Sequence, residues 1–276
     1  MPEIHPQIFF ILGCQRTGTT LMRLILESHP KISCVDESRS YTILKDAGLL
    51  NKELKSNKNK TWLGLKVPRI TEQLLEPFFA DVGIDFRTPN VYKRKKTIFM
   101  IRNVFDTIVS MKTLDQEGKS WLDKWAKTTV DFWERTDPVF KKQYSQDLEF
   151  LKNSADKDIV AAAIYWKFKT GSYFKYMNSG FPIIQIKYEN LVTESKKTIQ
   201  QVLDFLGLEW NNAVLSHEKI SHPETDEHGI TIGKNDTKLP ITKSSVGRYT
   251  KYLTPHEISQ VSHISKDLML ELNYKS

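Results

Sequence analysis

Short apolar runs alternate with amphipathic stretches along much of this chain. Four runs, each bounded by turn residues or charge, have the composition of buried strands: residues 8–13, 96–102, 182–188 and, more weakly, 62–68. Apolar residues at helical spacing follow these runs, at residues 21–28, 71–82, 103–114 and 193–208. This alternation predicts a three-layer α/β fold, in which helices flank a central parallel sheet and ligands bind at the carboxyl ends of the strands.

Residues 115–178 interrupt the alternation. Tryptophans occur there among many charged residues, at spacings that suit helices: Trp121, Trp125, Trp133 and Trp166. Such tryptophans are typical of an ordinary core. The alternative is that the segment is a helical insertion that caps the entrance to a binding site. Because we find no internal repeat, low-complexity tract or Pro/Gly-rich linker, we expect residues 1–276 to form one domain that includes this insertion.

Charge and composition narrow the classes of protein. The formal net charge of +7 favours anionic ligands, nucleic acid among them. No apolar run reaches the roughly 18 residues of a membrane span, and the first ten residues do not have the pattern of a signal peptide. Cys14 and Cys34 are too few for a disulfide framework or a four-ligand zinc site. We therefore expect a cytoplasmic protein without a membrane segment.

The stretch GCQRTGTT, residues 13–20, joins the first predicted strand to the first predicted helix. Gly13 and Gly18 keep the G-x-x-x-x-G spacing of a nucleotide-triphosphate loop, but Thr19 stands in place of the lysine that reaches the β- and γ-phosphates. Backbone N–H groups and a helix N-terminus can still cradle an anion, and Arg16 brings a positive charge. The loop predicts a P-loop-type fold whose anion is not ATP or GTP.

A second anion-binding pattern follows the strand predicted at 96–102. Arg102 ends that strand, and Ser110 lies eight positions later on the next helix. An arginine fork and a hydroxyl suit a phosphate group held by two hydrogen bonds. An arginine at a strand end is also typical of a surface ion pair, so the pattern alone leaves both interpretations open.

Four segments, in this order, resemble the sulfotransferases that use 3′-phosphoadenosine 5′-phosphosulfate (PAPS). They lie at residues 13–30, 99–111, 186–218 and 244–254. The chain is most similar to the tyrosylprotein sulfotransferase branch, which CVDESR at 34–39 also matches, whereas 115–178 departs from that branch. A transferred sulfuryl group carries less negative charge than a phosphoryl group. The reaction that the resemblance implies therefore needs neither the loop lysine nor a metal.

The resemblance also implies which residues hold PAPS and the product, adenosine 3′,5′-bisphosphate. The loop is expected to bind the 5′-phosphosulfate through Arg16, Thr17, Gly18, Thr19 and Thr20. The 3′-phosphate is expected to be bound by Arg102 and Ser110. Further donor contacts are implied for Tyr188, Ser244, Ser245 and Arg248. The branch has a basic residue near Leu114 that this chain lacks, which leaves that contact open, and Lys112 is a candidate substitute.

The chemistry needs a base that takes the proton of the acceptor hydroxyl. Asp36 and Glu37 are candidates, and in an extended segment their side chains would face opposite ways, so only one would reach the site. The resemblance implies that Glu37 is the base and also contacts the substrate, as Arg39 does. It further implies that Lys66 stabilises the transition state together with Arg16. A histidine base, His217 or His222, is the alternative.

The predicted activity is transfer of a sulfuryl group from PAPS to a hydroxyl or amine of a small-molecule acceptor, a natural product. The expected lack of a membrane anchor and the large helical segment favour this acceptor over a protein tyrosine, which is the alternative. The segment LGCQRTGTTL is similar to cyanobacterial toxin-tailoring sulfotransferases. A P-loop kinase and a basic nucleic-acid-binding protein are alternatives from other classes. The sulfotransferase interpretation expects no nucleic acid, membrane or metal partner.

Overall fold

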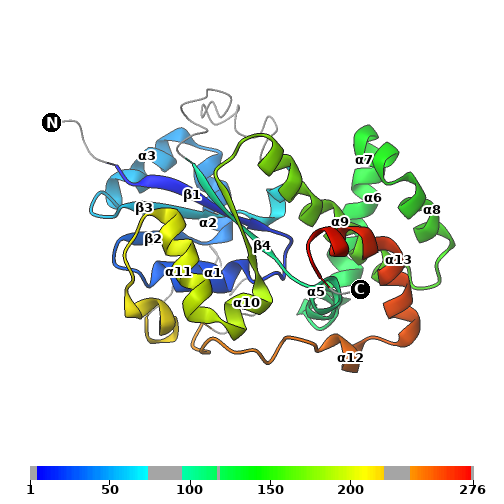
Figure 1. The fold of residues 1–276 in the computed structure, drawn as a ribbon. Helices are drawn as coiled ribbons and strands as arrows, with labels where there is room; N and C mark the ends of the chain where they lie inside the picture. The colour runs from blue at the N-terminus through cyan, green and yellow to red at the C-terminus, as the bar shows by residue number, and fades with distance from the viewer. Residues whose placement is uncertain (1–4, 74–94, 117–118, 221–236, 275–276) are drawn as a thin grey trace. The chain divides into compact units, whose positions relative to one another are not determined.

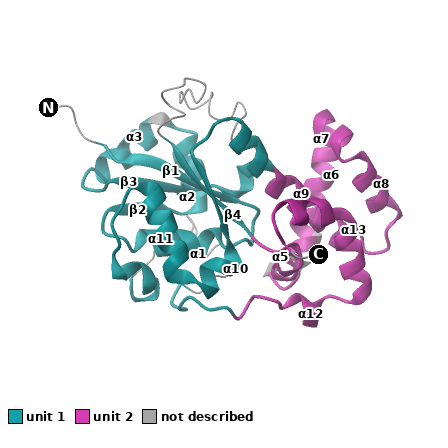
Figure 2. Cartoon of the chain, in the orientation of Figure 1, with its two compact units in different colours: residues 1–101, 172–243 teal, residues 102–171, 244–276 magenta. Residues whose placement is uncertain are grey.

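The computed structural model describes residues 5–73, 95–116, 119–220 and 237–274 (Figure 1). The chain divides into two compact units (Figure 2). Unit 1 comprises residues 1–101 and 172–243, and unit 2 comprises residues 102–171 and 244–276. The expectation that residues 1–276 form one domain stays a prediction.

Unit 1 is built on a five-stranded sheet in which every pair of neighbouring strands is parallel. The order β2-β3-β1-β4-β7 corresponds to Ile32–Val35, Trp62–Lys66, Gln7–Gly13, Lys96–Ile101 and Ile183–Lys187. Four of these strands confirm the predicted apolar runs. β2 is missing from the prediction because its four residues, ISCV, are too few and too mixed to form a recognisable run.

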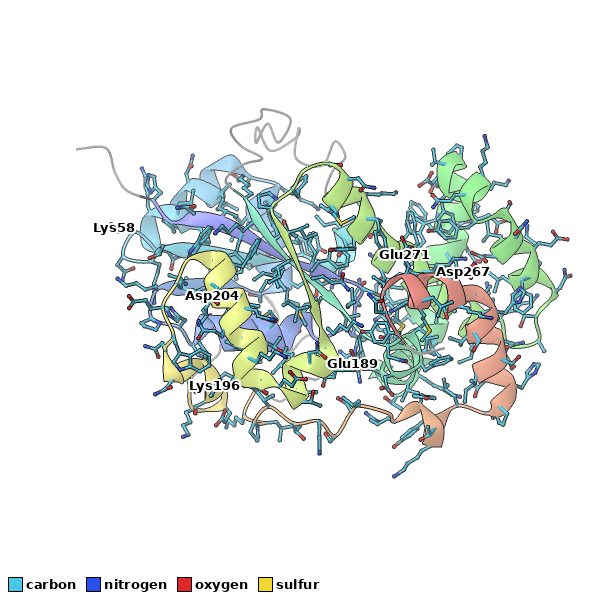
Figure 3. All side chains as sticks on the ribbon, viewed as in Figure 1. Lys58, Glu189, Lys196, Asp204, Asp267 and Glu271 are labelled. Atoms are coloured by element: carbon cyan, nitrogen blue, oxygen red, sulfur yellow. The ribbon has the colours of Figure 1, made fainter. Side chains whose placement is uncertain are left out.

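Two helices cover one face of this sheet, α1 (Thr19–Glu27) and α11 (Ser195–Leu206) (Figure 1). Their apolar side chains share one buried core with strand residues such as Phe9 and Ile98. The buried stripe of α11 is the predicted one: Ile199, Val202, Leu203 and Leu206. Lys196 and Asp204 lie on its exposed side (Figure 3). The helix ends at Gly207, whose φ of 74° is the left-handed conformation of a glycine C-cap.

The other face of the sheet is covered by the end of α9 (Lys157–Asn178). Phe99 of β4 points to this face because side chains alternate along a strand. Its ring packs against Tyr173 and Tyr176, with centroid distances of 5.5 and 6.2 Å. The prediction of a parallel sheet with helices on both faces is therefore confirmed.

The remaining elements of unit 1 are short helices. They are α2 (Glu37–Leu44), α3 (Ala47–Ser56), α10 (Tyr188–Thr193) and the 3-10 helices η1 (Pro68–Gln73), η4 (Asn212–Leu215) and η5 (His217–Lys219). The helix expected at 71–82 overlaps η1 at its start, and the rest of it lies outside the described residues. His222 lies outside them too, whereas His217 is buried.

In its described residues, unit 2 is helical apart from a short antiparallel pair, β5 (Asp115–Gln116) and β6 (Lys119–Ser120). Its helices, besides the first part of α9, are α5 (Val104–Lys112), the π-helix η3 (Leu122–Ala126), α6 (Lys127–Thr136), α7 (Pro138–Gln143), α8 (Ser145–Asn153), α12 (Tyr249–Tyr252) and α13 (Pro255–Glu271).

The tryptophans at 115–178 are mostly core residues. Trp121, Trp133 and Trp166 are buried, and Trp133 stacks on Tyr165 with 5.3 Å between the ring centroids. Trp125 differs, since 46% of it is exposed. The core interpretation is confirmed for three of the four, and a role of this segment as a cap stays a prediction. No helix within the described ranges combines the length and the apolar character needed to cross a bilayer.

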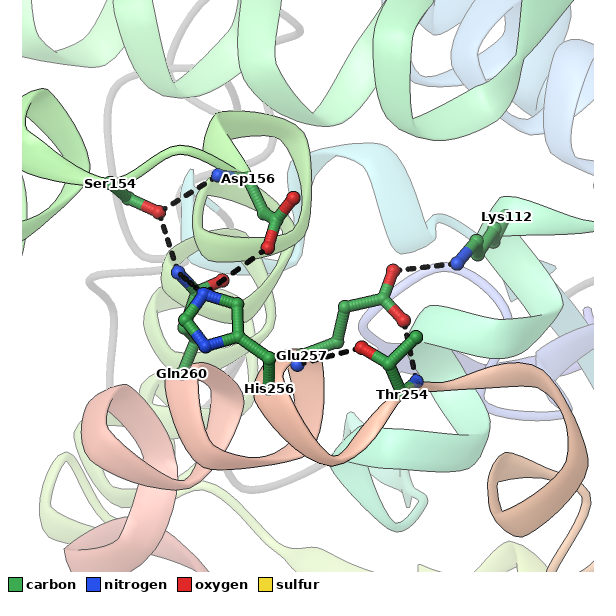
Figure 4. Close-up of polar contacts among 7 residues, drawn as sticks. All are labelled: Lys112, Ser154, Asp156, Thr254, His256, Glu257 and Gln260. Atoms are coloured by element: carbon green, nitrogen blue, oxygen red, sulfur yellow. Dashed lines mark hydrogen bonds and ion pairs between the residues drawn. The ribbon is translucent and has the colours of Figure 1, made fainter.

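Polar contacts attach the start of α13 to two other parts of unit 2 (Figure 4). Thr254 and Glu257 form a reciprocal capping box. The Oε1 atom of Glu257 also pairs with Lys112 of α5 at 2.6 Å. One turn later, Gln260 Nε2 donates to Ser154 Oγ, just after α8, at 2.9 Å. These bonds connect α13 to α5 and to the turn that precedes α9.

Candidate active site

The glycine loop connects β1 to α1 at the carboxyl end of a central strand. Gly13 and Gly18 have φ angles of 136° and 92°, which L side chains rarely adopt. A Cβ atom at Gly13 would collide with the carbonyl oxygen of Met100, and one at Gly18 would lie 2.5 Å from the ring of Tyr188. Space and backbone conformation therefore both require glycine at these positions.

The residues between and after the glycines carry the polar groups of the loop. Arg16 has a φ of 71°, an uncommon value for a residue with a side chain. Thr17 is buried, and its Oγ1 atom donates to the carbonyl of Cys14 at 2.6 Å. Thr19 and Thr20 begin α1, whose first turn has no acidic residue. The positive end of that helix dipole is therefore not offset by a carboxylate of its own first turn.

Thr71 of η1 holds the glycine loop in place. Its Oγ1 atom accepts a hydrogen bond from the Gly13 N–H at 3.1 Å and donates to the Gly13 carbonyl at 2.9 Å. The hydroxyl of Tyr176 donates to the Thr71 carbonyl at 2.5 Å. Thr71 is completely buried. No sequence pattern identifies Thr71, because a threonine at the edge of a predicted helix carries no distinguishing signal.

Glu37 is a buried carboxylate with a cation at each oxygen. It is the first residue of α2, and its side chain is 8% exposed. Oε2 lies 3.3 Å from the Nζ atom of Lys66, and Oε1 lies 3.0 Å from the Nε atom of Arg69. Lys66 ends β3 and pairs in register with Ile11 of β1, so it lies beside the strand that leads into the loop. Glu37 and Lys66, predicted separately, are therefore brought together.

The start of α2 places the Asp36 and Glu37 side chains in different surroundings. Asp36 is the N-cap of α2, and its carboxylate accepts from the Arg39 N–H at 3.1 Å. The segment is therefore a helix start rather than an extended stretch, which corrects the argument from alternating faces. Asp36 is engaged in capping, and Glu37 alone of the two lies between Lys66 and Arg69.

Two further side chains of α2, those of Tyr41 and Arg39, belong to the same helix as Glu37. Burial, and next the negative charge of Glu37, raise the pKa of the Tyr41 phenol above its ordinary value of 10.0. Tyr41 thus stays protonated at neutral pH and is not a competing base. Arg39, expected at the substrate, is 63% exposed at its side chain and pairs with Glu53 at 2.5 Å. It remains in reach of solvent on the same helix as Glu37.

Arg102 lies at the centre of a second cluster of polar contacts, within unit 2. It directly follows β4 and is buried. Its Nη2 atom donates to the Ser245 carbonyl at 2.6 Å, and its own carbonyl accepts from the indole N–H of Trp166 at 3.1 Å. Arg102 is therefore not a surface ion pair. The structure brings it together with Ser245, another predicted residue.

Asp106 of α5 fixes the same late loop. Its two carboxylate oxygens accept the backbone N–H groups of Gly247 and Tyr249, at 2.7 and 3.0 Å. The rings of Phe105 and Tyr249 stack at 5.0 Å. Asp106 is nearly fully buried and was not identified from the sequence, where an acidic residue in a first helical turn is typical of an ordinary helix start.

The remaining residues predicted for the 3′-phosphate also lie in unit 2. Ser110 is half-buried on α5, and Ser244 is exposed. The Arg248 guanidinium lies 4.9 Å from the ring centroid of Tyr252. Lys112, the candidate substitute, is instead paired with Glu257. In the described parts of the chain, no cluster of three or more His, Cys, Asp or Glu side chains could hold a metal.

A family model described as "Sulfotransferase domain" matches residues 6–273, nearly the whole chain. The chain belongs to the sulfotransferase family. This membership confirms the resemblance drawn from the four segments, and it confirms the prediction of an enzyme of the transferase class.

Curated sulfotransferases of the protein-tyrosine type are similar to this chain. Protein-tyrosine sulfotransferase 1 of Danio rerio is 23% identical over 77% of this chain, which spans 56% of the zebrafish protein's length. Protein-tyrosine sulfotransferase 2 of Gallus gallus is 21% identical over 97% of the chain and 69% of its own length. The match to this branch agrees with the branch indicated by the sequence.

Solved sulfotransferase structures share the fold. The sulfotransferase domain from the curacin biosynthetic pathway has a TM-score of 0.59 at 16% identity, with 98% of each chain covered. The sulfotransferase domain from the Synechococcus PCC 7002 olefin synthase has a TM-score of 0.57 at 14% identity. The match covers 96% of this chain and 97% of that domain. Mouse SULT7A1, solved in complex with PAP, has a TM-score of 0.52 at 15% identity. The match covers 95% of this chain and 84% of the mouse chain. The expected P-loop-type architecture is confirmed.

Proposed function

We propose that this sulfotransferase moves a sulfuryl group from PAPS to a hydroxyl or amine of a small-molecule acceptor, with Glu37 as the base. The observation that carries the proposal is the buried Glu37 carboxylate, 3.3 Å from Lys66, in the same unit as the glycine loop. A carboxylate can accept a proton from an acceptor hydroxyl, and a nearby lysine can stabilise negative charge on a leaving phosphate.

The groups of the loop suit the phosphosulfate of PAPS. Arg16, the first-turn threonines of α1 and the N–H groups of a helix N-terminus all favour a negatively charged group. The proposal assigns the 5′-phosphosulfate to Arg16, Thr17, Gly18, Thr19 and Thr20, with Tyr188 beside Gly18 as a further contact. PAPS supplies an activated sulfuryl group whose leaving group is a phosphate.

The proposal assigns the 3′-phosphate to residues of unit 2. Arg102 and Ser110 are the principal contacts, and Ser244, Ser245 and Arg248 are the secondary ones. The support is the burial of Arg102 and its bond to the Ser245 carbonyl, because a preorganised guanidinium loses little freedom when it binds a phosphate. The product that leaves this site would be adenosine 3′,5′-bisphosphate, PAP.

In the proposed reaction, Glu37 accepts the proton of the acceptor hydroxyl through one of its carboxylate oxygens. Lys66 and Arg16 direct positive charge at the leaving phosphate, which makes a metal unnecessary. Because Glu37 is buried, water is largely excluded from its carboxylate, and electrostatic contacts there are stronger than at the surface. Arg39, exposed on the same helix, is assigned to the acceptor.

The acceptor class is the finer part of the proposal. Domains from biosynthetic pathways share the fold, and the large helical segment at 115–178 departs from the tyrosylprotein branch; both favour a small natural product. A tyrosyl residue of a protein is the second candidate, favoured by the protein-tyrosine sulfotransferases among the relatives. A cytoplasmic location stays a prediction.

A transfer assay with ³⁵S-labelled PAPS tests the proposal. The acceptors are a tyrosyl peptide, 4-nitrophenol, an aliphatic alcohol and a primary amine, and PAP binding is measured by calorimetry with and without Mg²⁺. We expect PAP to bind without Mg²⁺ and label to pass to a small acceptor faster than to the peptide. Preferential labelling of the peptide would select the second candidate. No PAP binding and no transfer to any acceptor would reject the function.

A further inference from the structure

The 3-10 helix η1 carries a cation that the proposed mechanism does not use. Arg69, its second residue, donates from Nε to Oε1 of Glu37 at 3.0 Å. Its side chain is 53% exposed, whereas those of Glu37 and Lys66 are 8% and 9% exposed. Lys66 and Arg69 approach different oxygens of one carboxylate, so they do not compete for the same position.

The backbone of Arg69 is fixed relative to the glycine loop. Two residues further along η1, Thr71 exchanges two hydrogen bonds with Gly13. Pro68 before it has a restricted φ angle. The guanidinium of Arg69 also lies 5.6 Å from the ring centroid of Tyr41 on α2, within the range of a cation–π contact. Arg69 thus lies between Pro68 and the Thr71 anchor on its own segment, and its guanidinium contacts Glu37 and Tyr41 of α2.

The charges around Glu37 explain why a second cation is needed. In the proposed reaction, Lys66 serves the leaving phosphate, yet in this structure it lies 3.3 Å from Glu37. If Lys66 were the sole counter-charge, its turn toward the phosphate would leave a buried carboxylate without a compensating charge, which is strongly unfavourable. A guanidinium on the other oxygen removes that conflict, because it keeps Glu37 paired.

We propose that Arg69 is a positioning residue, which keeps the Glu37 carboxylate paired and oriented so that Lys66 can serve the donor. The proposal rests on the proposed function, since it assumes that Glu37 is the base. It gives Arg69 no contact with the reacting atoms. Arg69 acts through Glu37, so its contribution should disappear when Glu37 can no longer act as a base.

A double-mutant cycle tests this coupling, with ³⁵S-labelled PAPS as donor and the acceptor that the wild type labels fastest. The variants are Arg69→Ala, Arg69→Lys, Glu37→Gln and Glu37→Gln/Arg69→Ala. We expect Arg69→Ala to lower kcat by about 10–100-fold, by analogy with outer-shell groups that orient metal ligands, with unchanged PAP affinity. Arg69→Lys should restore most of kcat, and Arg69→Ala should have little effect in the Glu37→Gln background.

Arg135→Ala is the matched control, since Arg135 is an exposed arginine of α6 that donates to the Asp131 carbonyl. Thermal unfolding shows whether each variant folds. If Arg69→Ala does not fold, Arg69→Lys, alone and combined with Glu37→Gln, still provides the test. An unchanged kcat in Arg69→Ala, or an equal loss with and without Glu37, would overturn the assignment. So would a raised acceptor KM with kcat unchanged, which would instead make Arg69 an acceptor contact. Absence of any transfer by the wild type would reject the function itself.

Discussion

At the scale of single residues, Gly18 is constrained both by its φ of 92° and by the ring of Tyr188. We expect Gly18→Ala to lower PAP affinity at least tenfold and to reduce stability, because the left-handed backbone alone costs a Cβ-bearing residue about 1–2 kcal/mol. Calorimetry with PAP and thermal unfolding measure the two effects. Gly207→Ala is the control, since Gly207 also has a positive φ, 74°, but open space around it.

The control separates backbone strain from collision. Gly207→Ala should lose stability and keep PAP affinity, whereas Gly18→Ala should lose both. If Gly18→Ala bound PAP like the wild type, the loop would not be the donor site.

Arg102 tests recognition of the 3′-phosphate. We expect Arg102→Ala to weaken PAP by about 1.5–3 kcal/mol, the value of a hydrogen bond to a charged group. Binding of adenosine 5′-monophosphate, which has no 3′-phosphate, should hardly change. The two affinities are compared by calorimetry on the same protein samples. Equal weakening of both ligands would show that Arg102 acts by holding the Ser245 loop and not by contacting the phosphate.

Residue types at short spacing were predictable, and contacts between distant segments were not. Arg16 and Thr19 could be interpreted because they stand at defined places between two glycines. Arg69 and Asp106 could not, because each owes its role to a partner far away in sequence; Asp106 and Gly247 are 141 positions apart. Single-sequence patterns do not encode such pairs.

At the scale of elements, the start of α13 depends on pH. Burial alone would raise the pKa of Glu257, but the hydrogen bonds from Lys112 and from the Thr254 backbone outweigh it, and the pKa lies below its ordinary value of 4.5. A depressed folded-state pKa stabilises the fold above the unfolded-state value, and this stabilisation is lost as pH falls through the folded-state value.

Glu257→Gln measures this contribution. Glutamine keeps the size of the side chain and can still form the capping box, so the variant chiefly removes the charge pair with Lys112. We expect a loss of roughly 0.3–1 kcal/mol at pH 7, seen as a lower Tm, which shrinks as the pH falls below 4.5. Lys112→Gln should show the same trend. A difference that is constant or grows on acidification would contradict the assignment.

Elements with a strong period were predicted correctly, and weak ones were missed. The stripe of α11 and its glycine cap follow directly from spacing. β2 has four residues and no period of its own, and it forms because β3 offers a parallel partner along Ile32–Val35. The sequence predicts an extended segment at Asp36, where the structure has a helix start. A single N-cap before a helix without a clear apolar stripe gives little indication of the helix.

At the scale of the whole molecule, the α/β architecture followed from the alternation of apolar and amphipathic stretches, and the family followed from ordered motifs. The division into two compact units did not, because it depends on which segments pack together. The phosphosulfate residues and Glu37 belong to unit 1, and Arg102 with the Ser245 loop belongs to unit 2.

The most direct test of the central claim is the rate of sulfuryl transfer from ³⁵S-labelled PAPS by Glu37→Gln, measured beside PAP affinity. We expect turnover to fall about 10²–10⁴-fold, the usual contribution of a general base, while PAP binds as in the wild type. Asp36→Asn is the matched neighbour and should stay active, because asparagine caps a helix as well as aspartate does. If Glu37→Gln kept its rate, or Asp36→Asn were the inactive variant, Glu37 would not be the base.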